Sequence, residues 1–387
     1  MTFSYTVLGA GRQGAALAYD LAKNGEASRI VLADADERVA HAAAKRLKKL
    51  LPKTRCEFVA RRCDVSKATD ACGAMRGSDV TLSAVPYRFN AELAARAVQA
   101  KSSFLDLGGN TNVVRAELAL HAKAKKAGVS IVPDCGLAPG LGNHLAAHGV
   151  AVLDRAEHVH VRCGGLPEEP VGPLAYKLVF NFDGLINEYS GVGEFLRGGK
   201  RVDVPTLGEV EELDFGKLGV LEAAVTSGGT STCPETWKGA LKTYDYKTLR
   251  YPGHWDVIRA LFGIGAFEHE LVHGGREYEP RATLRALFES TLDFPRVRDI
   301  VLLRTIVIGK RKGKRVTLQY DVFERQDPKT GFTAMERGTA FPAALVAHFQ
   351  ARKLVAPGAR PLEVSVPAVQ YYEELPRHDI WVELRER

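Results

Sequence analysis

Residues 5–14 read Y-T-V-L-G-A-G-R-Q-G and decide the fold, because an apolar run leads into G-x-G-x-x-G and helix-forming residues follow over 15–23. Gly9 permits a tight turn, Gly11 lets a pyrophosphate approach bare backbone, and Gly14 lets the helix pack close to the strand. An ordinary glycine-rich turn is the alternative, but a strand before the motif and a helix after it favour a dinucleotide site. The predicted contacts in this turn are Gly9, Ala10, Gly11, Arg12, Gln13 and Gly14.

An acidic residue then stands where the ribose of such a cofactor is expected. Asp34 ends the next apolar run, residues 29–33, and follows Gly14 by about 20 residues. A carboxylate at this place accepts hydrogen bonds from both ribose hydroxyls of NAD and repels a 2′-phosphate. We therefore predict NAD as the cofactor. Its further contacts are predicted at Ala35, Asp64, Val65, Ala84, Val85, Pro86 and Gly108.

Length and composition are those of a globular protein with more than one core. The 387 residues suffice for two domains. The net charge of +7 comes partly from two basic clusters, 45–55 and 310–315, which we interpret as a solvated helix face and a hairpin tip. Neither cluster is interleaved with aromatic residues, so nucleic-acid binding is not expected. The six cysteines form no C-x-x-C pair, and no signal peptide or membrane-spanning run is visible, which favours a reduced, cytoplasmic protein with no membrane partner.

Strands and helices alternate through the first third of the chain. Predicted strands cover 5–8, 29–33, 56–60, 79–84, 103–107 and 129–132, and predicted helices cover 15–23, 37–51, 90–99 and 113–126. This alternation predicts an α/β fold with a Rossmann-type, doubly wound parallel sheet. Ligands bind outside the carboxyl ends of the strands in such sheets, so residues 83–87 and 106–110 should lie beside the cofactor.

The alternation stops at residues 133–140, P-D-C-G-L-A-P-G, which we interpret as a hinge into a second domain. Beyond it, strand-like runs at 158–162, 174–182, 298–308 and 315–324 and helices at 142–152 and 255–262 predict an α+β domain with a mostly antiparallel sheet. A helix over 339–352 is expected to return to the first domain, followed by an extended tail over 362–384. The predicted domains are 1–138 with 339–387 for NAD binding, and 139–338 for substrate binding and dimerisation.

A set of short motifs occurs in an order that is similar to a known family. The motifs are V-L-G-A-G (7–11), S-A-V-P-Y (83–87), D-L-G-G-N-T (106–111), D-C-G-L-A-P-G (134–140), G-G-L-P (164–167), Y-K-L (176–178), T-S-G-G (226–229) and L-R-Y-P-G-H (249–254). Together they resemble the saccharopine dehydrogenase-like family, and most closely its lysine 6-dehydrogenase branch. The resemblance covers residues 5–267, with a weaker match at 339–349. Residues 280–337 carry no motif of the family.

The resemblance implies an NAD-dependent oxidative deamination of the side-chain amine of L-lysine, giving 2-aminoadipate 6-semialdehyde, NADH and ammonia. Such an amine, with a reference pKa of about 10.4, must lose a proton before hydride leaves, so a base is needed near neutrality. Asp106, at the end of a predicted strand, could hold the ammonium or act as that base; a turn carboxylate is the alternative. Lys177, in the Y-K-L motif, is the second candidate catalytic residue, as a clamp for the substrate carboxylate; an outward-facing lysine is the alternative.

The substrate contacts are likewise implied by the resemblance. Arg250 is a candidate clamp, since arginine binds a carboxylate in a bidentate manner. Cys135 is interpreted as pocket lining, because amine oxidation needs no covalent step, with inert burial as the alternative. His254 is either a general base or a packed loop histidine. His144 and His148 share helical spacing without a nearby carboxylate, so no metal is predicted. The predicted substrate-binding set is Tyr87, Cys135, Tyr176, Thr248, Arg250 and His254.

Two other functions stay open at this point. A saccharopine- or carboxynorspermidine-type dehydrogenase would act on a bulkier secondary amine, although the T-S-G-G stretch favours the lysine branch. A catalytically inactive dinucleotide-binding regulator would keep the glycine-rich turn but lose the second-domain motifs, which are present here. The expected partners are a small amino acid and a second copy of the chain, because an exposed antiparallel sheet suits a homodimer.

Overall fold

The first part of the chain forms a seven-stranded parallel sheet, which confirms the predicted fold class. In the computed structural model, which describes residues 2–387, the strand order is β17–β6–β5–β4–β1–β2–β3. The strands are β1 (Phe3–Leu8), β2 (Ala27–Asp34), β3 (Glu57–Arg62), β4 (Val80–Ser83), β5 (Ser103–Asp106), β6 (Ser130–Val132) and β17 (Gly358–Ala359). The order reverses between β1 and β4. The carboxyl ends of these two strands therefore flank the crevice in which doubly wound sheets bind ligands.

Helices connect these strands on both faces of the sheet. They are α1 (Arg12–Asn24), α2 (Glu37–Leu50), α3 (Ala68–Met75), η1 (Tyr87–Phe89), α4 (Asn90–Ala100), α5 (Thr111–Leu118) and α6 (His121–Ala127). The single helix predicted over 113–126 is wrong in detail, because the chain breaks into α5 and α6. At the break, Leu120 N–H bonds the Glu117 carbonyl, three residues back instead of four. Helix α3 was not predicted.

The second domain is built on a nine-stranded sheet in the order β10–β11–β12–β7–β15–β16–β18, with β8 beside β12 and β9 beside β8. Its strands are β7 (Arg155–Pro167), β8 (Val192–Arg197), β9 (Lys200–Pro205), β10 (Glu211–Asp214), β11 (Val220–Val225), β12 (Thr243–Arg250), β15 (Asp299–Arg311), β16 (Lys314–Arg325) and β18 (Val382–Glu386). Strands β7 and β12 run parallel and the other pairs antiparallel, as expected for a mostly antiparallel sheet. Lys310 pairs with Arg315, so the basic run 310–315 is the predicted hairpin tip.

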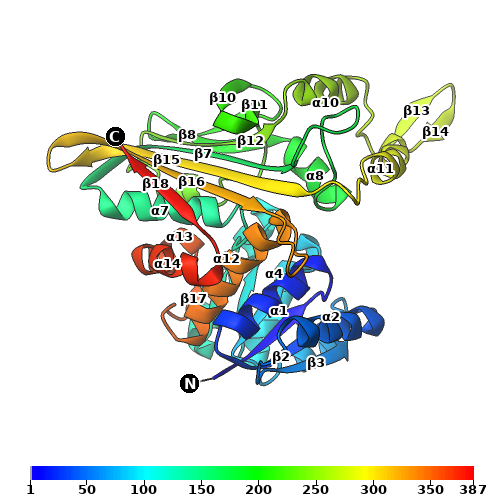
Figure 1. The fold of residues 1–387 in the computed structure, drawn as a ribbon, viewed down its shortest axis with the longest axis vertical. Coiled ribbons are helices and arrows are strands. Elements are labelled where there is room, and N and C mark those ends of the chain that lie inside the picture. The colour runs from blue at the N-terminus through cyan, green and yellow to red at the C-terminus, as the bar shows by residue number, and fades with distance from the viewer. Residues whose placement is uncertain (1) are drawn as a thin grey trace.

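Two helices join the sheets, as Figure 1 shows. Helix α7 (Leu141–Val152) follows the hinge and packs under the second sheet, where Thr305 of β15 bonds the Gly142 carbonyl. Helix α12 (Ala334–Ala351) returns to the first domain as predicted, and Gln350 Nε2 bonds the Phe104 carbonyl of β5 at 3.1 Å. It begins five residues before the predicted start, because Thr333 and Glu336 form a capping box.

Two predictions about the second half of the chain are wrong. Residues 174–182 form a loop leading into α8 (Phe182–Tyr189) instead of a strand, because a short apolar run can be buried in either form. The tail over 362–384 is mainly helical, with α13 (Leu362–Ser365), α14 (Ala368–Glu374) and η3 (Leu375–His378). Its prolines stand at helix starts, where proline is tolerated. The tail then ends in β18, which pairs with β16 of the second sheet.

The remaining elements also belong to the second domain. They are η2 (Gly216–Leu218), α9 (Cys233–Thr236), α10 (His254–Gly263), β13 (Leu271–His273), β14 (Arg276–Tyr278) and α11 (Pro280–Thr291). Helix α10 matches the helix predicted over 255–262. The β13–β14 hairpin projects from the body of the protein beyond α11 (Figure 1).

Candidate active site

The turn between β1 and α1 has the shape that a pyrophosphate needs. A Cβ on Gly14 would lie 1.8 Å from the Gly9 carbonyl oxygen, so the helix packs on the turn only with glycine there. A Cβ on Gly11 would meet nothing within 4 Å, so this backbone is open. Gly11 is also the N-cap of α1 and supplies no side-chain cap. The first N–H groups of α1 therefore start beside open backbone, which fits a bound phosphate group.

Asp34 lies at the carboxyl end of β2, beside this turn. Its Oδ2 accepts a hydrogen bond from Ala10 N–H at 2.9 Å, and its Oδ1 accepts one from Asp36 N–H at 3.0 Å. Each oxygen keeps a second lone pair for a ribose hydroxyl. Ala35 lies between Asp34 and Asp36 in the chain. Asp64 and Val65 lie in the turn after β3, where bonds from Ser66 lower the pKa of the Asp64 carboxyl.

The first-turn side chains of α1 contact helix α12. Arg12 Nε forms an ion pair with Glu336 Oε1 at 2.6 Å, and Gln13 Nε2 donates to the Met335 carbonyl at 3.3 Å. These contacts leave the backbone N–H groups of Arg12 and Gln13 for the cofactor contacts predicted there.

The segment after β4 borders both the glycine-rich turn and the segment after β5. A Cβ on Gly9 would lie 2.7 Å from the Ala84 carbonyl oxygen and 3.1 Å from Val85 Cγ1. Beyond Pro86, the Tyr87 ring packs on Gly109, where an added Cβ would lie 3.0 Å from Tyr87 Cδ1. Ala84 and Val85 thus lie against the turn, and Tyr87 lies against the backbone beside Gly108.

Three buried acids, Asp106, Glu117 and Asp134, form what we call the carboxyl cluster. Asp106 Oδ1 accepts hydrogen bonds from Gly108 N–H at 2.6 Å and from Asp134 N–H at 3.3 Å. Ser231 donates to Asp134 Oδ2. Within residues 2–387, Asp106 Oδ2, both Glu117 oxygens and Asp134 Oδ1 receive no hydrogen bond from an N–H or hydroxyl donor.

Burial governs the protonation of this cluster. It raises the pKa of Asp106 and of Glu117, and it raises the pKa of Asp134 to about 8 together with the charge of Asp106. Asp106 and Glu117 lie within hydrogen-bonding reach of each other. The charge of Asp106 adds to the effect of burial on Glu117, so ionisation of one acid opposes ionisation of the other. Asp106 accepts two backbone N–H groups, which favour its ionised form, and as a carboxylate it could hold an ammonium group or accept its proton.

Cys135 and Lys177 are both engaged with backbone carbonyls. Cys135 Sγ donates to the Val132 carbonyl at 3.2 Å, and burial raises the pKa of its thiol well above the usual value. This matches an unreactive thiol. Lys177 Nζ donates to the Val297 carbonyl at 2.5 Å, and burial lowers its pKa. The structure thus directs Lys177 toward the loop before β15.

Arg250 lies at the end of β12 in an aromatic environment. It is 1% exposed, with Nε bonded to the Tyr189 hydroxyl and Nη1 bonded to the Leu249 carbonyl, each at 2.9 Å. Its guanidinium carbon lies 4.8 Å from the centre of the Tyr176 ring. Among the described residues, Arg250 Nη2 and the Tyr176 hydroxyl are buried without a hydrogen-bond partner. These unpaired donors suit a carboxylate.

His254 and Thr248 lie close to Arg250: His254 bonds the same Tyr189 hydroxyl, and Thr248 stands two residues earlier in β12. His254 Nδ1 lies 2.9 Å from the Leu174 carbonyl and Nε2 lies 3.0 Å from the Tyr189 hydroxyl, so the ring donates to the first and accepts from the second. Burial lowers the pKa of His254 to about 3. These bonds favour the packed histidine over the general base. The Thr248 hydroxyl bonds that of Thr226 at 2.7 Å.

Helix α8 links the two domains at this place. Asn187 Nδ2 donates to the Gly109 carbonyl at 2.6 Å, and Glu188 Oε2 lies 3.9 Å from Arg250 Nη2. Sequence reasoning missed Glu117, Asp134 and Glu188. Asp134 stands inside a quoted motif, whereas a single glutamate in a helical pattern is usually a solvated residue and gives no signal.

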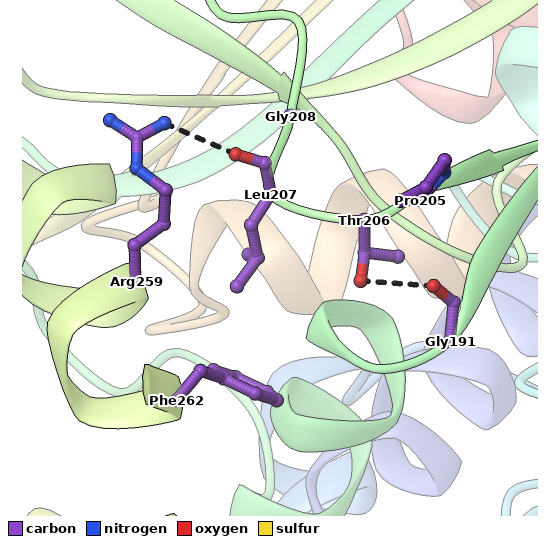
Figure 2. A pocket seen from close by; sticks show the side chains of 7 residues that line it. All are labelled: Gly191, Pro205, Thr206, Leu207, Gly208, Arg259 and Phe262. Carbon is purple, nitrogen blue, oxygen red and sulfur yellow. Dashed lines mark hydrogen bonds between the residues drawn. The ribbon is translucent and has the colours of Figure 1, made fainter. Parts of the chain in front are cut away.

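The pocket in Figure 2 is a different place. It is lined by Gly191, Pro205, Thr206, Leu207, Gly208, Arg259 and Phe262. Arg259 donates to the Leu207 carbonyl, and none of the predicted site residues lines this pocket. Across residues 2–387, no three His, Cys, Asp or Glu side chains are grouped so as to hold a metal ion. The helices of the same span include none that is long and apolar enough to cross a membrane.

The strand order, the open glycine-rich turn and Asp34 define a dinucleotide-binding α/β protein with a second, mostly antiparallel domain. Comparison with protein families agrees. Residues 5–132 match the saccharopine dehydrogenase NADP binding domain, and residues 136–380 match the saccharopine dehydrogenase C-terminal domain. The chain belongs to the saccharopine dehydrogenase family, which confirms the resemblance seen in the motifs.

Individual relatives are more distant. The chain is 27% identical over 207 residues to the saccharopine dehydrogenase [NADP(+), L-glutamate-forming] of Pyricularia oryzae, covering 50% of this chain and 44% of the relative. It is 22% identical over 258 residues to the mitochondrial alpha-aminoadipic semialdehyde synthase of Rattus norvegicus, covering 63% and 27%. The chain thus spans less than half the length of these curated relatives. The solved apo saccharopine dehydrogenase (L-Glu forming) of Saccharomyces cerevisiae has the same fold, with a TM-score of 0.78 at 17% identity and full coverage of both chains.

Proposed function

We propose that this protein is an NAD-dependent oxidoreductase that deaminates the side-chain amine of L-lysine or of a close diamino acid. The observation that carries the proposal is the pair of unsatisfied groups at the two sides of the site. Asp106 offers a negative charge beside the dinucleotide crevice, and Arg250 offers unpaired donors from the second sheet. An amino acid with an amine at its far end carries a carboxylate that suits Arg250 and an ammonium group that suits Asp106.

The choice of NAD is supported by the acids at the end of β2, although the matched family domain and the Pyricularia relative are named for NADP. Asp34 is held beside the turn by two backbone N–H groups. The neighbouring Arg38 could neutralise a 2′-phosphate, but it is bonded to Asp36 at 2.7 Å. A 2′-phosphate would therefore meet uncompensated negative charge at Asp34.

The reaction needs a proton acceptor and a place for the amine. Bound NAD would supply the hydride acceptor. The substrate ammonium loses a proton to Asp106, whose pKa burial has moved toward that of the amine. Hydride then leaves the amine-bearing carbon, and water adds to the resulting imine. Lysine, NAD⁺ and water thus give 2-aminoadipate 6-semialdehyde, NADH, an ammonium ion and one proton.

Saccharopine is the second candidate substrate, because the relatives' names favour it. Saccharopine carries more carboxylates than lysine. On the substrate side of the site Arg250 is the cation with unpaired donors, whereas Lys177 is bonded to a backbone carbonyl. This supports the smaller substrate.

The test is an assay of NADH absorbance with the purified protein, NAD and a panel of lysine, ornithine and related amines. We expect NADH to form with lysine. A parallel assay follows NADPH oxidation with 2-aminoadipate 6-semialdehyde and glutamate. NADPH oxidation there would favour the saccharopine alternative, and no NADH with any amine would contradict the proposal.

A further inference from the structure

Glu188 stands at the end of α8, where the helix is fixed against both domains. The Asn187 side chain bonds the Gly109 carbonyl at 2.6 Å, and Ser227 donates its hydroxyl to the Asn187 carbonyl and its N–H to the Glu188 carbonyl. The Glu188 side chain is 28% exposed and lies 3.9 Å from Arg250 Nη2, which is too far for a hydrogen bond. Glu188 is therefore held beside Arg250 without being bonded to it.

The hydrogen-bond donors and acceptors around Arg250 are not all paired. Arg250 Nη2 and the Tyr176 hydroxyl are buried donors with no acceptor among residues 2–387. Glu188 is an acceptor beside them, and the pair carries one positive and one negative charge. The side chains of the site thus need one group that accepts from Arg250 and Tyr176 and one that donates to Glu188.

We propose that Arg250 and Glu188 together bind the zwitterionic head of an α-amino acid. Arg250 Nη2 and the Tyr176 hydroxyl donate to the α-carboxylate, and Glu188 accepts from the α-ammonium. This inference rests on the proposed function, which places the reacting amine at the far end of the same molecule. It makes Glu188 the residue that distinguishes an α-amino acid from an amine lacking the α-ammonium.

The electrostatics support this role. Burial raises the pKa of Glu188 to about 7, and the nearby charge of Arg250 opposes the rise. An ammonium group bound to Glu188 would favour its ionised form further. The titratable and charged groups that face Glu188 are Arg250, Cys163, Tyr176, Tyr189 and Tyr246. None of these five groups is expected to titrate near neutral pH, because arginine stays charged and burial raises the pKa of the thiol and of the phenols.

The test compares L-lysine with 6-aminohexanoate, which keeps the carboxylate and the far amine but lacks the α-ammonium. Calorimetric titration of the NADH-saturated protein gives Kd for each, and steady-state assays with NAD give kcat/KM. We expect wild type to prefer lysine by about 10- to 100-fold. Glu188→Gln should remove most of that preference and leave 6-aminohexanoate within about threefold of wild type. Arg250→Lys should weaken both compounds, because both carry the carboxylate.

Glu92→Gln is the matched control, since Glu92 is exposed on α4 and pairs with Arg96. The Kd of wild type for lysine should also fall as the pH rises through about 7 by more than the Kd for 6-aminohexanoate does, and this difference between the two compounds should disappear in Glu188→Gln. If Glu188 served only to position Arg250, Glu188→Gln would instead change the Kd values of both compounds equally. Equal changes, an unchanged preference, or no lysine binding by wild type would overturn the inference. Lysine binding through Glu188 without turnover would contradict the proposed function and keep the inference.

Discussion

The carboxyl cluster of the first domain and the Arg250 environment of the second both contain buried polar atoms without partners, but they manage charge differently. Among residues 2–387 neither Glu117 oxygen has a hydrogen-bond partner, and burial with the charge of Asp106 raises the pKa of Glu117, which favours the neutral acid. Arg250 cannot lose its proton and is stabilised by the Tyr189 hydroxyl, a carbonyl and the Tyr176 ring. The first side of the site therefore consists of titratable acids alone, whereas the Arg250 side combines a permanent positive charge with one titratable acid, Glu188.

The largest effect should follow from Asp106→Asn, which removes the charge of the carboxyl cluster while keeping its shape. The amide can still accept from Gly108 N–H, but it can neither hold an ammonium group nor take its proton. We expect kcat/KM with lysine and NAD to fall by about 10²- to 10⁴-fold. The melting temperature checks the fold, and Asp203→Asn, at an exposed acid of β9, is the control. Activity within threefold of wild type would refute the role of Asp106.

A second change tests Asp34 of the first domain. Its carboxylate accepts hydrogen bonds from two backbone N–H groups, whereas the carboxyl group of Glu117 accepts none among residues 2–387. Replacing Asp34→Gly together with Asp36→Arg removes repulsion and supplies a cation. We expect the ratio of kcat/KM for NADP over NAD to rise by about 10- to 100-fold. Asp36→Arg alone, which keeps Asp34, should shift the ratio less. A wild type that already prefers NADP would show that Asp34 does not have the assigned role.

The smallest effect concerns stability. The pKa of Glu117 in the folded protein lies above its ordinary value of 4.5 because of burial and the Asp106 charge. Above that pH the folded protein binds more protons than the unfolded chain, so this group lowers stability as the pH rises, by about 1.4 kcal/mol for each unit of pKa shift. Glu117→Gln keeps a donor toward Asp106 and removes the titration. Its melting temperature should fall less than that of wild type between pH 5 and pH 8. Parallel curves, matching those of the exposed control Glu92→Gln, would contradict this account.

Local pattern was sufficient for the elements whose partners are close in sequence. The strand, glycine turn and helix of residues 5–23, the acid at Asp34 and the hairpin tip at 310–315 all appear as predicted. In each case, periodicity and turn chemistry act over a few residues. The alternation of strands and helices also predicted the doubly wound parallel sheet, and the structure then supplied its strand order.

Long-range packing decided the rest. Residues 174–182 form a partly buried loop and the tail is helical, because burial of their apolar side chains against other segments determined the form of those runs. The Y-K-L motif singled out Lys177 as a clamp for the substrate carboxylate, yet its ammonium is bonded to the Val297 carbonyl. Glu117 and Glu188 carry no local signal at all. The sequence by itself determined the dinucleotide-binding fold and the place of Asp34 at the end of β2, whereas only tertiary structure placed Glu117 beside Asp106 and Glu188 beside Arg250, because burial and charge at these positions depend on segments distant along the chain.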